Sequence, residues 1–194
     1  MIDLAATFAY QKYVVWRSLL EEPNLTLYYK YACKRAESGT MDLADSQVPG
    51  TPSTGKDFIM DGLLADFLPS VEHACGLRLF PTYSYFRVYQ RGDLLAKHKD
   101  RPACEISVTL CLGYQGPQPW PIWIDGPGGA SATELAPGDA MVYRGVECAH
   151  WRESFDGDHQ AQVFLHYVDQ AGPYADWKFD KRENLTIIGR QLPR

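Results

Sequence analysis

Residues 83–101, YSYFRVYQRGDLLAKHKDR, contain both a strand signal and a candidate site. Within this stretch, Tyr85, Arg87 and Tyr89 alternate with Phe86, Val88 and Gln90, which predicts a half-buried strand over residues 84–90. Gly92 and Asp93 break this pattern. The apolar residues 94–96 follow, and the segment ends at His98-Lys99-Asp100. Residues two apart in a strand point to the same side, so His98 and Asp100 can aim an imidazole and a carboxylate at one point. A nitrogen and an oxygen ligand that converge in this way suit a borderline divalent metal ion.

A His-x-Asp motif is common by itself, and the alternative reading is a charged surface turn. A second histidine favours the metal site. His150 stands alone in ECAHWRE (residues 147–153), about fifty residues later. A strand near the rim of a rolled sheet could bring it to His98 and Asp100. Three protein ligands would leave a metal ion with open positions.

Length and composition indicate one globular domain over residues 1–194. Hydrophobic residues make up 45% of the chain and aromatic residues 13%, which is typical of folded proteins. The net charge of −5 argues against a nucleic-acid partner. The five cysteines are scattered and odd in number, which favours reduced thiols. No apolar run is long enough to span a membrane. We therefore expect a cytoplasmic protein without a membrane partner; its oligomeric state stays open.

The first 76 residues are expected to be mainly helical. Residues 12–16 (KYVVW) look like a strand, whereas residues 25–37 and 57–75 have apolar side chains at helical spacing. Pro69 should kink or interrupt the second helix, and Gly76 suits its C-terminal cap. The polar residues 40–56 form a long loop that either covers a substrate or is an inert surface segment.

Residues 77–177 are expected to form a β-roll core, followed by a polar tail over residues 178–194. The expected strands, separated by Pro- and Gly-rich turns, are residues 77–81, 84–90, 105–114, 121–125, 132–135, 140–144, 147–153 and 160–169. About eight strands without intervening helices are typical of a sandwich, jelly roll or small barrel. The predicted fold class is α+β and mainly β, with N-terminal helices packed against a rolled double sheet.

The order of these segments resembles that of the Fe(II)/2-oxoglutarate-dependent dioxygenases, and most of all the prolyl 4-hydroxylase branch. HKD at residues 98–100 is followed by PGDAMVYRG at residues 137–145, then by His150, and then by a final strand that begins near His159. The resemblance extends over residues 83–169 and includes the spacing from Tyr89 to His98. It implies a double-stranded β-helix, or jelly roll.

The resemblance also implies a catalytic role for each residue of the motif. His98, Asp100 and His150 would hold Fe(II), with 2-oxoglutarate and O2 in the remaining positions, and Tyr89 would contact 2-oxoglutarate. The implied reaction is a hydroxylation coupled to conversion of 2-oxoglutarate into succinate and CO2. The resemblance also allows a requirement for ascorbate. The substrate would be a peptidyl proline, an amino acid or a small metabolite.

The chain departs from the family where the 5-carboxylate of 2-oxoglutarate is bound. The family usually has Arg or Lys nine or ten residues beyond the distal histidine, a position that suits a carboxylate partner. Here those positions are His159 and Gln160. Candidates for the role are His159, Arg152 and Arg87. His166, seven residues after His159, is expected to be a core or sheet residue on the opposite face.

Two other functions remain open from the sequence. The missing basic residue on the final strand would suit a non-catalytic β-roll binding module that kept the fold and lost the chemistry. A cupin-type metal enzyme that does not use 2-oxoglutarate would keep the metal ligands and show no response to the cosubstrate.

Overall fold

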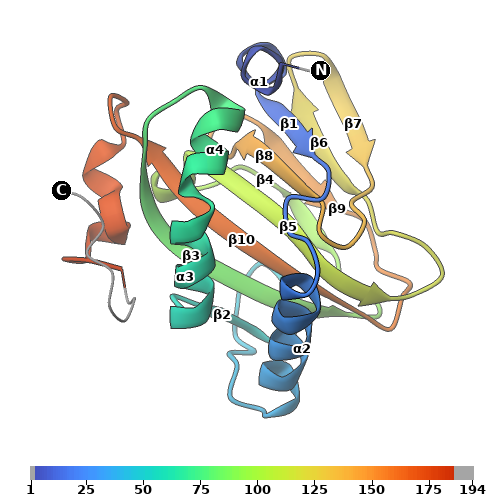
Figure 1. The fold of residues 1–194 in the computed structure, drawn as a ribbon. Helices are drawn as coiled ribbons and strands as arrows, with labels where there is room; N and C mark the ends of the chain where they lie inside the picture. Colours follow the sequence, from blue (N-terminus) through green and yellow to red (C-terminus); the bar gives the residue numbers. More distant parts are fainter. Residues whose placement is uncertain (1–2, 186–194) are drawn as a thin grey trace.

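The computed structural model describes residues 3–185, and its strands form two antiparallel sheets (Figure 1). One sheet has six strands in the order β1-β8-β5-β10-β3-β2, and the other has four in the order β4-β9-β6-β7. The strands are β1 (Tyr13–Trp16), β2 (Ser53–Gly55), β3 (Leu79–Gln90), β4 (Leu95–His98), β5 (Ile106–Gln115), β6 (Ile122–Gly126), β7 (Gly129–Thr133), β8 (Ala140–Arg144), β9 (Ala149–Arg152) and β10 (His159–Asp169). The mainly β architecture predicted from the sequence is confirmed.

Four α-helices lie in the N-terminal part of the described chain. They are α1 (Leu4–Gln11), α2 (Asn24–Glu37), α3 (Phe58–Asp66) and α4 (Leu68–Cys75). The helix predicted over residues 57–75 is interrupted near Pro69, which is one of the two expected effects of this proline. Helix α3 ends, and α4 begins afresh with Pro69 in its first turn, where a missing N–H is tolerated. Asp57 caps α3 by accepting two backbone hydrogen bonds. Gly76 caps α4 with a φ of 71°, as expected.

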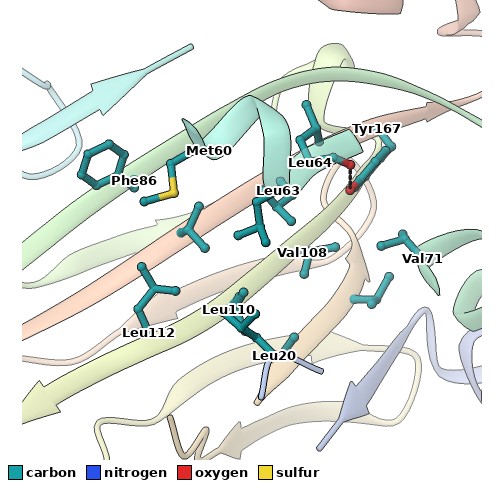
Figure 2. Packing of buried hydrophobic residues seen from close by; sticks show 14 of the residues in the cluster. Leu20, Met60, Leu63, Leu64, Val71, Phe86, Val108, Leu110, Leu112 and Tyr167 are labelled. Atoms are coloured by element: carbon teal, nitrogen blue, oxygen red, sulfur yellow. Dashed lines mark hydrogen bonds between the residues drawn. The ribbon is translucent and has the colours of Figure 1, made fainter. Parts of the chain in front are cut away.

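Helix α3 covers the outer face of the six-stranded sheet (Figure 2). Leu63 and Leu64 pack in one buried cluster with Val108 and Leu110 of β5, and each is at most 3% exposed. The Tyr167 hydroxyl of β10 donates a hydrogen bond to the Leu64 carbonyl oxygen at 2.8 Å. Burial of apolar area stabilises by about 25 cal/mol per Å². This layer therefore holds β5 and β10 in place, and the opposite faces of these strands carry the site.

Strand β3 is continuous from Leu79 to Gln90, although the sequence suggested two shorter strands. Pro81 lies inside it and has no N–H to give to a ladder. The pairing of β3 with β10 shifts register between His166 and Tyr167, opposite this proline. The irregularity accommodates Pro81, and the odd-numbered residues from 83 to 89 then share the inner face of the sheet.

The segment after β10 packs back against the sheet. In the 3-10 segment Ala175–Lys181, Asp180 forms ion pairs of 2.9 Å with both Arg101 and Lys56. The part of the predicted tail that the structure describes, residues 178–185, thus packs against the sheet, and residues 186–194 lie outside the described residues. Across the described residues, no helix combines the length and apolar character that a bilayer crossing needs.

Candidate active site

A cavity of about 400 Å³ lies between the inner faces of the two sheets. Strands β3 and β10 line one side of it, and β4 and β9 line the other. Small-molecule sites usually have volumes of roughly 300–1,000 Å³, so the size is that of a pocket for small ligands.

Three of the predicted site residues converge on this cavity. His98 ends β4 and pairs directly with His150 on β9, while Asp100 follows two residues after His98. Asp100 Oδ1 lies 3.7 Å from His98 Nε2 and 3.6 Å from His150 Nε2. The three ligand atoms all lie within 4.8 Å of one another. Two imidazoles and one carboxylate at this separation can bind a single divalent ion.

Both imidazole rings are oriented by backbone carbonyl groups. His98 Nδ1 lies 2.8 Å from the Ala96 oxygen, and His150 Nδ1 lies 3.1 Å from the Cys148 oxygen. A carbonyl oxygen only accepts, so Nδ1 carries the hydrogen and Nε2 keeps a lone pair for a metal ion. Burial lowers the pKa of His150, although the charge of Asp100 opposes the shift. The neutral ring that results is the form that coordinates metals.

Asp100 is held by two neighbours that the sequence did not reveal, one at its carboxylate and one at its backbone. Ser107 Oγ donates to Asp100 Oδ2 at 2.9 Å, and the Asp100 backbone N–H donates to the Gly145 carbonyl oxygen at 2.9 Å. A Cβ atom at Gly145 would collide with Asp100 Oδ2 and with the Cys104 carbonyl oxygen. Only glycine therefore allows the turn after β8 to approach so closely. Asp100 Oδ1 is left facing the two imidazoles.

Asp100 also belongs to a second cluster, with Cys104 and His166. Burial, reinforced by the charge of Asp100, raises the pKa of the Cys104 thiol to about 12, and metals bind the thiolate. His166 Nδ1 lies 2.9 Å from Ser107 Oγ, so this histidine contacts the residue that orients Asp100. His166 is buried in the sheet, as expected, but it also lines the cavity. The cluster of His98, Asp100 and His150 is the better metal site.

Arg152, two residues after His150 on β9, is a buried cation on the cavity wall. Its side chain is fully buried, and its Nη1 donates to the Trp120 carbonyl oxygen at 2.5 Å. Its Nε and Nη2 atoms have no hydrogen-bond partner, and no carboxylate pairs with it within residues 3–185. Burial lowers the pKa of Arg152, but a guanidinium stays charged in proteins. Because an unpaired buried charge is costly, this position suits an anionic ligand group.

Tyr89 and Arg87 of β3 line the same cavity as Arg152. Tyr89 is fully buried, and its ring centroid is 4.9 Å from that of Trp120. Arg87 Nη1 lies 3.3 Å from the Tyr89 hydroxyl, while its Nη2 pairs with Asp45 at 2.8 Å. Asp45 belongs to the loop over residues 40–56, so this loop does cover one side of the cavity.

His159 does not reach the cavity. It begins β10 on the outer face, where its Nε2 lies 2.8 Å from the Tyr29 hydroxyl and 3.8 Å from Cys33 Sγ, both on α2. The next residue, Gln160, faces inward and is 2% exposed. Strand alternation explains the difference, because adjacent positions point to opposite faces. Of the three candidates for the 5-carboxylate, only Arg152 and Arg87 line the cavity.

Solved structures with the same arrangement of sheets are similar to this chain at low sequence identity. A Pseudomonas putida prolyl-4-hydroxylase aligns over 86% of this chain and 98% of its own, with 18% identity and a TM-score of 0.66. The epimerase SnoN, in complex with Fe3+, alpha ketoglutarate and nogalamycin RO, aligns over 98% and 92%, with 13% identity and a TM-score of 0.74. This chain has the double-stranded β-helix fold of the Fe(II)/2-oxoglutarate oxygenases.

A third structure of the double-stranded β-helix fold is HygX from Streptomyces hygroscopicus, with nickel, 2-oxoglutarate and hygromycin B bound. It aligns over 88% of each chain, with 11% identity and a TM-score of 0.69. No protein-family model matches the sequence, and a search of curated proteins finds no relative. The likeness therefore rests on the fold, and the function has to be argued from the cavity.

Proposed function

We propose that this protein is an Fe(II)- and 2-oxoglutarate-dependent oxygenase that hydroxylates an organic substrate. The observation that carries the proposal is one strand, β9, which presents a metal ligand and an unpaired buried cation to the same cavity. The overall reaction consumes 2-oxoglutarate, O2 and a C–H bond of the substrate. It yields succinate, CO2 and an alcohol, so one oxygen atom enters succinate and the other enters the product.

The donor set fits Fe(II). His98 and His150 offer Nε2 atoms, and Asp100 offers Oδ1, all within 4.8 Å of one another. Two histidines and one carboxylate leave the remaining positions of a six-coordinate ion free for other ligands. Ser107 holds the carboxylate of Asp100 and Gly145 holds its backbone, which is the outer support that metal sites require.

The spacing along β9 fits 2-oxoglutarate. His150 and Arg152 are on the same face, about 6–7 Å apart, because a strand rises roughly 3.3 Å per residue. This distance is on the scale of a five-carbon dicarboxylate. One end would lie at the metal ligands, and the Arg152 guanidinium would bind the 5-carboxylate through charge-assisted hydrogen bonds from its free Nε and Nη2 atoms. Tyr89 adds a hydroxyl-bearing wall on the same side.

When bound, Fe(II) would supply the oxidative chemistry with O2, and the protein supplies positioning. His98, Asp100 and His150 would hold the ion. Arg152 would orient the cosubstrate, and the walls of the cavity between the two sheets limit the access of water to the reacting groups.

The test is a succinate assay in the presence of Fe(II), 2-oxoglutarate and O2. The wild-type protein is expected to form succinate slowly even without substrate. D100A is the matched control, because it removes the carboxylate that is the proposed metal ligand. Its circular dichroism spectrum should stay that of the folded wild type, while succinate formation should be lost. Thermal unfolding with Ni(II), with and without 2-oxoglutarate, gives a second readout.

The outcomes separate the three functions. Succinate from the wild type and a 2-oxoglutarate-dependent rise in Tm support the oxygenase. A Tm that rises with metal and does not change on addition of 2-oxoglutarate points to a cupin-type metal enzyme. Absence of succinate and of both Tm shifts points to a binding module and overturns the proposal.

A further inference from the structure

The loop over residues 40–56 inserts a carboxylate into the cavity. Asp45 Oδ1 pairs with Arg87 Nη2 at 2.8 Å, and its Oδ2 accepts a hydrogen bond from the Tyr85 hydroxyl at 2.7 Å. The loop meets the sheet through β2, which pairs with β3. The Asp45 carboxylate therefore pairs with Arg87 on the wall of the cavity in the way that a ligand carboxylate would.

Arg87 is a buried residue of the cavity wall. Its side chain is 1% exposed, it lines the cavity, and its Nε has no partner within residues 3–185. Burial works to lower the pKa of Arg87, but Tyr89, Tyr85 and Asp45 outweigh it and the pKa is raised. The position is a permanent buried cation that requires an anionic partner in every state of the protein.

The charges of the cavity favour an anionic ligand beyond 2-oxoglutarate. In the proposed function Asp100 is used by the metal ion and Arg152 by the 5-carboxylate. The remaining charged residues on the wall are Arg87, Lys99, Arg101 and Asp45. Arg101 pairs with Asp180 at 2.9 Å, and Lys99 is exposed, so Arg87 is the buried cation that a further ligand could use. A buried cation attracts a ligand group of the opposite charge.

We propose that Arg87 anchors a carboxylate of the primary substrate, and that Asp45 holds this place until the substrate displaces it. The inference rests on the proposed function and specifies its substrate class. The rings of Tyr85 and Phe164, with centroids 6.2 Å apart, lie next to each other on the cavity wall and offer an apolar surface to a substrate. The substrate is therefore a small carboxylic acid with an apolar or aromatic body, because the cavity of about 400 Å³ also has to hold 2-oxoglutarate.

An exchange of one carboxylate for another keeps Arg87 paired throughout, which avoids a bare buried charge. Asp45 is suited to leave, because its side chain is 21% exposed and lies at the edge of the cavity. Burial works to raise the pKa of Asp45, but the Tyr85 hydroxyl and the charge of Arg87 outweigh it and the pKa is lowered. Asp45 is thus an ionised competitor at neutral pH, and it should weaken the binding of every carboxylate substrate.

The test uses calorimetric titration of protein loaded with Ni(II) and saturated with 2-oxoglutarate, so that Arg152 is already occupied and no turnover takes place. The probes are 3-phenylpropanoate and its neutral analogue 3-phenylpropanamide. The wild type is expected to bind the acid at least about tenfold more tightly than the amide, as one or two charge-assisted hydrogen bonds would give.

The decisive variant is D45N. An Asn side chain keeps an oxygen for the backbone N–H groups of Gln47 and Val48, and it loses the competing charge. D45N is expected to bind the acid about tenfold more tightly than the wild type and the amide equally well. A gain of affinity cannot come from misfolding. The matched control is D93N, which weakens the contact of Asp93 with Thr51 of the same loop without touching Arg87, and it should leave the ratio of acid to amide affinity unchanged.

R87M is expected to bind acid and amide equally. Equal affinities for the two probes in the wild type, or no gain in D45N, overturn the substrate assignment even if the wild type forms succinate from 2-oxoglutarate. A gain in D93N as large as that in D45N also overturns it, because loosening of the loop would then explain the effect. Failure of the proposed function would appear separately, as absence of succinate in the wild type.

Discussion

Neighbouring residues of β10 face two environments that differ in how they are stabilised. On the outer face, Val163 and Leu165 are fully buried in an apolar cluster under the helices. On the inner face, Gln162 donates to Thr109 Oγ1 at 2.7 Å and accepts from Gln160 at 3.0 Å. The outer layer depends on buried area, which has no direction, whereas the inner layer depends on specific partners.

The inner face also leaves polar atoms without partners in the described structure. They include Nε and Nη2 of Arg152, Nε of Arg87 and the side-chain oxygen of Gln160. Such atoms are costly in a folded protein unless a ligand or water completes them. The outer face thus contributes stability and the inner face contributes function, and substitutions should separate the two.

The largest effect is expected from L165A on the outer face. Leu165 is fully buried, so its truncation should leave a cavity and lower the free energy of unfolding by about 2–5 kcal/mol. Urea denaturation measures this loss. Ni(II) affinity, measured by calorimetry below the unfolding transition, should stay that of the wild type. A large loss of metal affinity in a stably folded L165A would contradict the separation of the two faces.

R152M on the inner face is expected to weaken ligand binding without a loss of stability, the opposite of L165A. Removal of an unpaired buried charge should leave the Tm of the ligand-free protein unchanged or raise it. The affinity for 2-oxoglutarate should fall by roughly 10- to 100-fold, because charge-assisted hydrogen bonds contribute about 1.5–3 kcal/mol. Calorimetry with Ni(II)-loaded protein measures the affinity. An R152M protein that binds 2-oxoglutarate normally would remove Arg152 from the site.

A smaller effect is expected from G145A, which tests the support of Asp100. The added methyl group would push on the Asp100 carboxylate, so Ni(II) affinity should fall by about tenfold, the lower end of the loss seen when outer support of a ligand is removed. Gly62 provides the control, since it lies in α3 with nothing within 4 Å of its added methyl group. G62A should keep full Ni(II) affinity, and an equal loss in both variants would argue against the role of Gly145.

The smallest effect is expected from H159A. His159 bonds to Tyr29 on the outer face, so its removal should change the apparent KM for 2-oxoglutarate by less than about twofold, with a loss of stability near 1 kcal/mol. A steady-state succinate assay gives the KM. A rise of tenfold or more would return His159 to the list of cosubstrate ligands.

The sequence predicted most of the strands because their alternation and their Gly- and Pro-rich turns are local signals. It also placed His98, Asp100 and His150 in one group, since their order resembles a known family. It left the 5-carboxylate ligand open, because the choice between His159 and Arg152 depends on which face of a strand each residue occupies. Ser107 and Gly145 escaped detection because their contacts with Asp100 exist only once β5 and β8 pair.

The most direct test of the account is a crystal structure with Ni(II) and 2-oxoglutarate bound. The account predicts one metal ion about 2 Å from His98 Nε2, His150 Nε2 and a carboxylate oxygen of Asp100, with the 5-carboxylate on Arg152. A metal ion bound instead by Asp100, Cys104 and His166, or a 2-oxoglutarate molecule whose 5-carboxylate avoids Arg152, would contradict it.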